Sequence, residues 1–236
     1  MDPVNKVEVP QDNLDQVKAL VKEYVEKLNQ NPIIEEARRR WQEHAPDWAR
    51  YHRPEHTDDV LEESLFFAIA DGITDERQLE LLGIMAAFHD VGMTMEPSNP
   101  DNLRQDHEAR GAILVREIMT RAGSYTEEEI KIVTESIEDT KILFVNGVLI
   151  QQQARHELGK YLLDADVSNF GRSDFSQKSE DEFAELQLVL KPPPDRSTFN
   201  KNTLGLIKNH HFQSQAGIKY RTRIQEENIF NLEKVA

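Results

Sequence analysis

Two metal-binding residue types stand side by side at the end of an apolar segment. Residues 86–92 read Ala-Ala-Phe-His-Asp-Val-Gly, so His89 and Asp90 follow a stretch whose apolar residues recur at helical spacing. Those residues are Leu81, Leu82, Ile84, Met85 and Phe88. A carboxylate at the edge of a buried surface is costly unless it is paired or bound to a cation. The segment therefore indicates either a metal site or a core histidine beside a helix-capping aspartate.

Two further residues could complete a metal site. Pro54 favours the first turn of a helix, which places His56 within that turn. Asp166 ends an apolar helical segment in the last third of the chain. Two imidazoles and two carboxylates suffice to hold a divalent cation and leave positions open for water and substrate. The chain has no cysteine, so only His, Asp and Glu are available, and they suit Mn, Fe, Mg or Zn.

The apolar periodicity predicts an all-α fold in a single domain over residues 1–236. The expected segments are a loose arm at 1–12, helices at 13–28, 33–44, 54–71, 74–90, 106–123 and 124–139, a helix from about 152 leading into 162–171, and helices at 173–190, 197–211 and 214–234. The last two lie within a C-terminal helical region at 196–235. Asn146-Gly147 between β-branched residues predicts a short β-hairpin near 142–150.

Three short motifs resemble the HD-domain metal-dependent phosphohydrolase superfamily, and most closely its cyclic-nucleotide phosphodiesterase-like branch. Tyr51-His52-x-x-x-His56-x-x-Asp59-Val60 resembles Tyr-His-Asn-x-x-His-Ala-x-Asp-Val of that branch. The segment 87–91, Ala-Phe-His-Asp-Val, resembles Ala-x-His-Asp-Val, and 165–169, Ala-Asp-Val-Ser-Asn, resembles Ala-Asp-Leu-Ser-Asn. The three matches occur in the family's order and span a motif-bearing core at 51–170.

The resemblance implies a role for each matched residue. It implies that His56, His89, Asp90 and Asp166 are metal ligands, with Asp90 able to bridge to a second ion. It implies that His52 is the general acid and that a metal-activated water is the nucleophile. One cation belongs to this interpretation, and a second is left open.

The implied activity is hydrolysis of a phosphate ester, with a nucleotide or nucleotide-like substrate. The branch follows its His-Asp-Val with Asp-His-Pro-Gly, whereas this chain has Gly92-Met93-Thr94-Met95, and no purine-binding glutamine is identified. The sequence therefore leaves the choice between a monoester and a diester open. Two alternatives are a di-iron oxygenase of the same superfamily and a silent metal- or nucleotide-binding module.

Several residues outside the motifs are candidates for a second metal or for substrate binding. His107 lies where HD proteins often have a further histidine, and Thr140 and Lys141 follow a helix that could border the site. A C-terminal basic group could bind phosphate or simply form a solvated helix face, and it includes His210, His211, Lys219 and Arg221. His156, ten residues before Asp166, is expected on another face of the same helix.

The formal net charge of −15 argues against nucleic acid and anionic membranes as partners. A small phosphorylated substrate would need local attraction from a metal or a few basic side chains. The sequence has no apolar run of membrane-spanning length and no signal-peptide pattern, so a cytoplasmic protein is expected. The sequence gives no oligomeric state.

Overall fold

The computed structural model describes residues 14–145, 148–150 and 152–236, and its fold is all-α. The expected arm at 1–12 lies outside the described residues. The α-helices are α1 Leu14–Leu28, α2 Pro32–His44, α3 Pro54–Ala70, α4 Glu76–Phe88, α5 His107–Ala122, α6 Glu127–Asp139, α7 Gly159–Asp166, α8 Phe175–Val189, α9 Arg196–Asn209 and α10 Gln215–Leu232. Two short 3-10 helices, η1 (Val91–Thr94) and η2 (Ser168–Gly171), follow α4 and α7. No helix in the described part is long and apolar enough to cross a membrane.

Side-chain caps fix where many of these helices begin. Asn31 accepts a hydrogen bond from Ile33 N before α2, and Asp75 caps α4 through Gln78 N. Thr126 and Glu129 form a reciprocal capping box at the start of α6. Such caps satisfy amide groups that have no partner inside the helix.

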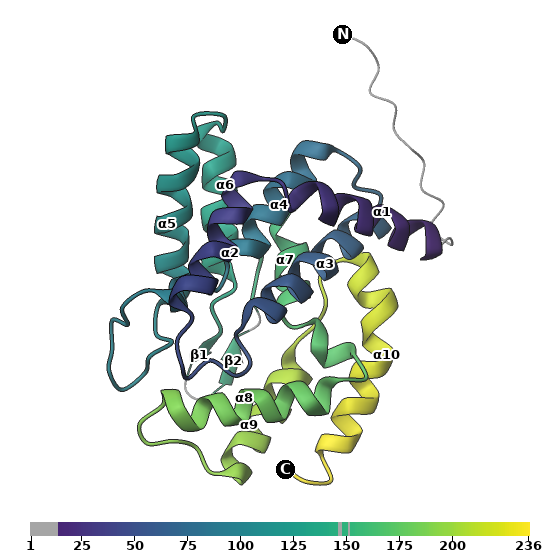
Figure 1. Cartoon of the computed structure of the whole chain (residues 1–236). Coiled ribbons are helices and arrows are strands. Elements are labelled where there is room, and N and C mark those ends of the chain that lie inside the picture. Colours follow the sequence, from purple (N-terminus) through teal and green to yellow (C-terminus); the bar gives the residue numbers. More distant parts are fainter. Residues whose placement is uncertain (1–13, 146–147, 151) are drawn as a thin grey trace.

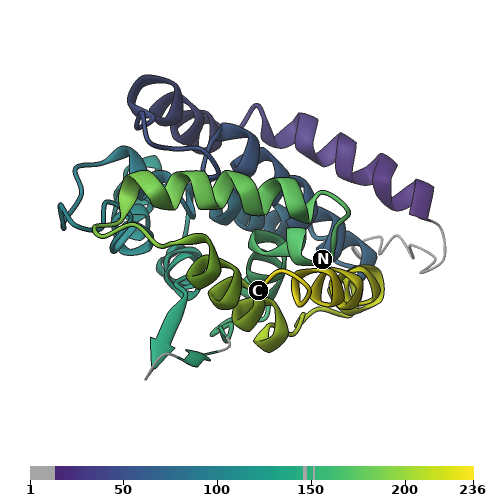
Figure 2. The same cartoon turned by 90° about the horizontal axis from the view of Figure 1, so that it is seen from below.

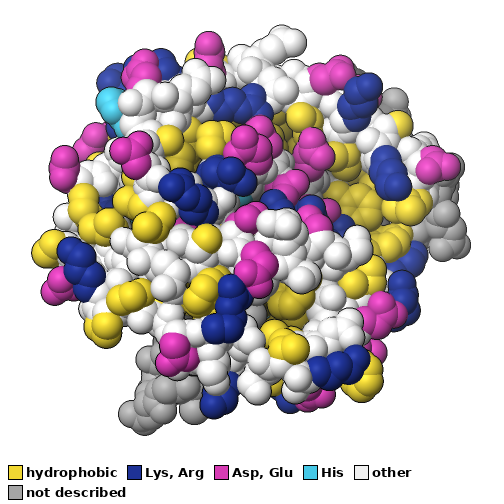
Figure 3. Space-filling view, turned by 60° about the horizontal axis from the view of Figure 1, so that its bottom comes forward, with side chains coloured by type: hydrophobic (Ala, Val, Ile, Leu, Met, Phe, Trp, Pro, Cys, Tyr) yellow, Lys and Arg dark blue, Asp and Glu magenta, His cyan; other side chains and the backbone are white. Residues whose placement is uncertain are grey.

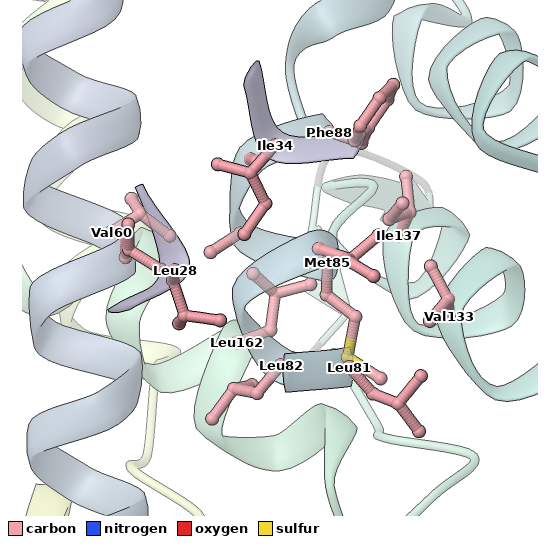
Figure 4. Packing of buried hydrophobic residues seen from close by; sticks show 14 of the residues in the cluster. Leu28, Ile34, Val60, Leu81, Leu82, Met85, Phe88, Val133, Ile137 and Leu162 are labelled. Atoms are coloured by element: carbon pink, nitrogen blue, oxygen red, sulfur yellow. The ribbon is translucent and has the colours of Figure 1, made fainter. Parts of the chain in front are cut away.

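Helix α4 is the centre of the larger core. Its residues are buried on all sides from Leu81 to Phe88, and it contacts α1, α2, α3, α5, α6 and α7. Figure 4 shows Leu82 and Met85 of α4 packed among side chains of the surrounding helices, such as Ile137 and Leu162. A helix that is apolar all round must be enclosed. Its C-terminal end, which carries His89 and Asp90, is therefore held inside the protein.

Two glycines let α5 approach the end of α4 closely. A Cβ on Gly92 would lie 1.9 Å from His107 O, and a Cβ on Gly111 would lie 2.7 Å from Phe88 O. Backbone cannot give way as a flexible side chain can, so only glycine fits at these positions. The contact brings the N-terminus of α5 beside η1.

The C-terminal elements form a second, smaller cluster of buried residues. Val167, Phe170, Phe175, Ile207 and Leu232 make up this cluster. Figure 1 shows α8 and α9 below the rest of the chain and α10 along one side, and Figure 2 shows α8 and α9 from below. Helices α8 and α9 thereby lie close to η2, which follows α7 directly.

Strands β1 (Leu143–Val145) and β2 (Val148–Ile150) pair antiparallel, with Leu143 opposite Ile150. The expected Asn146-Gly147 turn lies outside the described residues.

The expected helix start near 152 is wrong, because α7 begins at Gly159. The segment before it runs along the end of α6 instead, where Arg155 donates to Asp139 at 2.6 Å. A Cβ on Gly159 would lie 2.7 Å from Ser136 Oγ, so this close contact with α6 continues to the start of α7.

Candidate metal centre

Three segments far apart in the sequence bring four donor residues together. His56 lies in the first turn of α3, His89 and Asp90 follow α4, and Asp166 is the last residue of α7. His56 Nε2 lies 3.3 Å from Asp166 Oδ1, 3.5 Å from Asp90 Oδ2 and 3.5 Å from His89 Nε2. His89 Nε2 lies 3.0 Å from Asp90 Oδ2 and 3.5 Å from Asp166 Oδ1. We call these four residues the donor cluster.

These separations fit the donors around a single cation. Ligands about 2.1 Å from an ion, at tetrahedral or octahedral angles, lie roughly 3.0–3.4 Å from one another. His89 Nδ1 lies 2.7 Å from Ala86 O, so a neutral ring donates its N–H there and turns the lone pair of Nε2 toward the cluster. Asp90 Oδ2 is buried and, with that neutral ring, accepts no hydrogen bond among the described residues. This orphaned oxygen and the inward Nε2 are consistent with a bound cation.

The two carboxylates make the donor cluster strongly attractive to positive charge. Burial lowers the pKa of His89, but the negative charges of Asp90 and Asp166 outweigh burial and hold it well above its ordinary value. Burial raises the pKa of Asp90, yet the neighbouring histidines bring it well below its ordinary value. Burial dominates at His56, whose pKa is lowered. Both carboxylates are therefore ionised at neutral pH, and a divalent cation would compensate them.

His107 lies directly beside the donor cluster, as its position in the sequence suggested. Its Nε2 is 3.1 Å from Asp90 Oδ1, and its Nδ1 is 2.7 Å from Arg104 O. The close contact of Gly92 with the start of α5 holds it there. From this position His107 could bind a second metal ion or contact a substrate.

His52 belongs to a buried polar group that the sequence analysis did not identify. Its Nδ1 lies 2.6 Å from Glu185 Oε1, and Glu185 Oε2 accepts the backbone N–H groups of Arg50, Tyr51 and His52 at 2.9–3.0 Å. Glu185 is fully buried on α8, about 130 residues away in sequence. No local pattern marks it, because glutamates are frequent on exposed helix faces.

Arg104 completes this group with a positive charge. Its guanidinium donates to Glu182 Oε1 at 2.8 Å and lies 3.4 Å from Glu185 Oε1. Its Nη2 lies 3.3 Å from His52 Nε2. His52, Glu182 and Glu185 could by distance also hold a metal, but the guanidinium already supplies the positive charge that these carboxylates require. The donor cluster is therefore the better candidate for a metal site among the described residues.

The donor cluster opens into a cavity of about 490 Å³. Its lining includes Asp90, Asp166, His52, Arg104 and His107. Thr140 and Lys141 also line it, as expected from the sequence, although Lys141 is half-exposed and pairs with Asp106 at 2.8 Å. A small molecule in this cavity would lie against the donor cluster.

The C-terminal basic residues are not part of this cavity's lining. His210 is buried against Phe170 and Phe212, and His211 and Lys219 are exposed. Arg221 pairs with Glu63 at 2.6 Å, on the outer side of α3. These residues therefore do not line the cavity, and their role in phosphate binding stays a prediction.

His156 likewise lies away from the donor cluster, but it does not lie on another face of the helix that carries Asp166, as was expected. It precedes α7 rather than lying on it, and its Nε2 lies 2.7 Å from Glu135 Oε2.

Comparisons with known proteins give no match: no family model, no curated protein and no solved structure matches the chain.

Proposed function

We propose that this protein is a divalent-metal-dependent hydrolase of a phosphate ester, of the HD-domain type. The convergence of His56, His89, Asp90 and Asp166, of which the two aspartates line the cavity, is the observation that carries the proposal. The three motifs at 51–60, 87–91 and 165–169 support it independently. A nucleotide or nucleotide-like ester is the substrate class that the motif resemblance favours.

The donor cluster would hold the cation. When bound, such an ion polarises a phosphoryl oxygen and lowers the pKa of a coordinated water toward neutrality. The same ion would neutralise phosphate charge in a chain whose formal net charge is −15. The buried Asp90 and the partly buried Asp166 fix the position of that charge relative to the cavity.

Arg104 and His52 would act on the phosphate from one wall of the cavity. The guanidinium of Arg104 is a planar donor suited to phosphate oxygens, and it is held in place by Glu182. His52 donates from Nδ1 to Glu185, and its Nε2 accepts from Arg104. For His52 to protonate a leaving oxygen from Nε2, the ring must gain a second proton and Arg104 must turn toward the phosphate.

The charges around His52 favour the extra proton. Burial and Arg104 lower the pKa of His52, but Glu185 and Asp90 together raise it above its ordinary value. A histidine that is partly protonated near neutral pH is suited to general-acid catalysis. His52 thus has the acid role that the resemblance implies, and Glu185 orients its imidazole ring.

Hydrolysis of chromogenic esters tests the proposed function. We expect Mn-supplemented protein to hydrolyse p-nitrophenyl phosphate or bis-p-nitrophenyl phosphate, and Asp90→Asn to lower turnover by at least about 100-fold. Asp101→Asn, an exposed aspartate in the 95–106 loop, is the matched control and should retain activity. Equal turnover in wild type and Asp90→Asn would refute the proposal. Absence of turnover combined with tightly bound iron would favour the oxygenase alternative.

A further inference from the structure

The cavity has an apolar half that the proposed chemistry does not use. Beyond the donor cluster its lining comes from η2, from α8 and the residue after it, and from α9, and it includes Phe170, Phe175, Leu186, Leu190, Phe199 and Leu206. Val167, which follows Asp166 directly, also lines the cavity and joins the two halves. A molecule whose phosphate meets the cation can therefore extend its remainder along this apolar wall.

The size of the cavity indicates a ligand much larger than phosphate alone. Sites for organic ligands typically enclose about 300–1,000 Å³, and this cavity of about 490 Å³ lies within that range. Phosphate alone would leave the side chains of α8 and α9 facing water. Covering an apolar wall with an apolar group is favourable in proportion to the area removed from water. The apolar half is thus suited to the organic part of an ester.

The charges in this half argue against a second phosphate. Lys178 pairs with Asp59 at 2.8 Å, and Glu182 pairs with Arg104. The other polar residues of this region are neutral, and they include Asn202 and Thr203. A polyphosphate or a charged sugar chain would have to break these pairs. An uncharged group meets no such cost.

We infer that the substrate is a phosphate ester whose organic part is uncharged and largely apolar, with a ring that lies against Phe170, Leu186 and Leu206. This inference rests on the proposed function, because the metal must hold the phosphate end. It narrows that function to esters that present an uncharged, largely apolar ring to this wall. A nucleotide would meet this condition only through its base, and inorganic polyphosphates, which have no organic part, are excluded as good substrates.

Binding of two non-hydrolysable phosphonates to the Mn-loaded protein tests the inference by calorimetry. Phenylphosphonate and methylphosphonate share the metal-binding group and differ only in the ring. We expect phenylphosphonate to bind at least about tenfold more tightly, because the ring displaces water from the apolar wall.

Variants on two different helices locate the effect. Leu186→Gln on α8 and Leu206→Gln on α9 should each reduce the advantage of the phenyl compound about three- to tenfold and leave methylphosphonate binding unchanged. Leu188→Gln is the matched control, since Leu188 is 48% exposed on α8 and is not part of the cavity lining. Retained Mn binding shows that the variants are folded.

The outcomes separate this inference from the proposed function. Equal affinity for the two phosphonates, together with ester hydrolysis, would overturn the inference and leave the hydrolase intact. If neither phosphonate bound to protein that holds Mn, both the inference and the proposed function would be overturned. A phenyl advantage that persists in both lining variants would place the ring elsewhere and contradict the assigned wall.

Discussion

At the scale of single residues, the motif positions alone do not describe the site. His52 matched a motif, but Glu185 and Arg104, which hold its ring, have no sequence signature. Glu185 accepts three backbone N–H groups as well as His52, so it fixes both the position of the segment 50–52 and the direction of the imidazole. A carboxylate can be buried at such a point only when this many donors hydrogen-bond to it.

We expect Glu185→Gln to lower kcat about 10- to 100-fold while KM and bound metal stay close to the wild-type values. The amide lacks the negative charge that orients His52 and favours its protonated form. Steady-state kinetics with metal analysis measures both effects. Glu180→Gln, on the exposed side of α8, should behave as wild type. Loss of metal from Glu185→Gln would show that Glu185 supports the donor cluster rather than His52.

His210 should make the stability of the fold depend on pH. Burial lowers its pKa from 6.5 to about 4, and its Nε2 has no hydrogen-bond partner among the described residues. The folded state therefore prefers the neutral ring. The stability is fully present above pH 6.5 and is lost as the pH falls toward 4, by up to about 3 kcal/mol.

Denaturant unfolding at pH 7 and pH 4.5 measures this loss. We expect His210→Leu to lose less stability between these two pH values than the wild type. His44→Leu, which replaces an exposed histidine, should keep the wild-type dependence. An identical pH dependence in His210→Leu and the wild type would show that other groups cause the acid sensitivity.

At the scale of elements, the contact between η1 and α5 positions the site. The sequence departs from the resembled family at 92–95, and the departure has a structural reason at Gly92. Any side chain there would collide with His107 O, so the glycine permits the approach that brings His107 to Asp90. A backbone contact of this kind involves two segments that a single-sequence pattern does not connect.

Gly92→Ala should lower the free energy of unfolding by about 1–3 kcal/mol and move His107 away from Asp90. Denaturant unfolding measures the free energy of unfolding, and metal affinity reports the displacement of His107. Gly205→Ala on α9 is the matched control, because nothing lies within 4 Å of a Cβ there and alanine is favoured in helices. A Gly92→Ala protein as stable as wild type would contradict the tight contact.

Much of the fold was predictable from periodicity and caps, whereas the site was predictable only in part. Apolar spacing marked the helices that carry His56 and His89, because each has a face or a whole surface to bury. The segment 152–158 was predicted wrongly, because its contacts with α6 replace helix formation. The sequence shows only that the C-terminal histidines belong to a basic group. It does not reveal that His210 is buried between aromatic rings.

At the scale of the whole molecule, the acidic charge and the phosphate chemistry are compatible. Figure 3 shows Lys and Arg side chains interspersed with Asp and Glu over one face rather than gathered in a basic patch. Under the proposed function, attraction for a phosphate would therefore be local, at the donor cluster and Arg104. The cation would also connect α3, the end of α4 and α7, which come from distant parts of the chain.

Removal of the metal should therefore lower the thermal stability of the whole fold. An ion at 100 times its Kd stabilises the folded state by about 2.7 kcal/mol, which corresponds to roughly 5–10 °C in Tm for a chain of this size. Thermal unfolding with Mn and with EDTA measures the shift. We expect no such shift in Asp166→Asn, and a full shift in that variant would contradict the assigned ligands.

Metal binding by the donor cluster is the central claim, and calorimetric titration of chelator-treated protein with Mn tests it most directly. We predict one tight site per chain in the wild type, and at least a 100-fold loss of affinity in Asp90→Asn and His89→Gln, with Asp101→Asn unchanged. Wild-type affinity in both donor variants, or no binding of Mn, Fe, Mg or Zn by the wild type, would contradict the account.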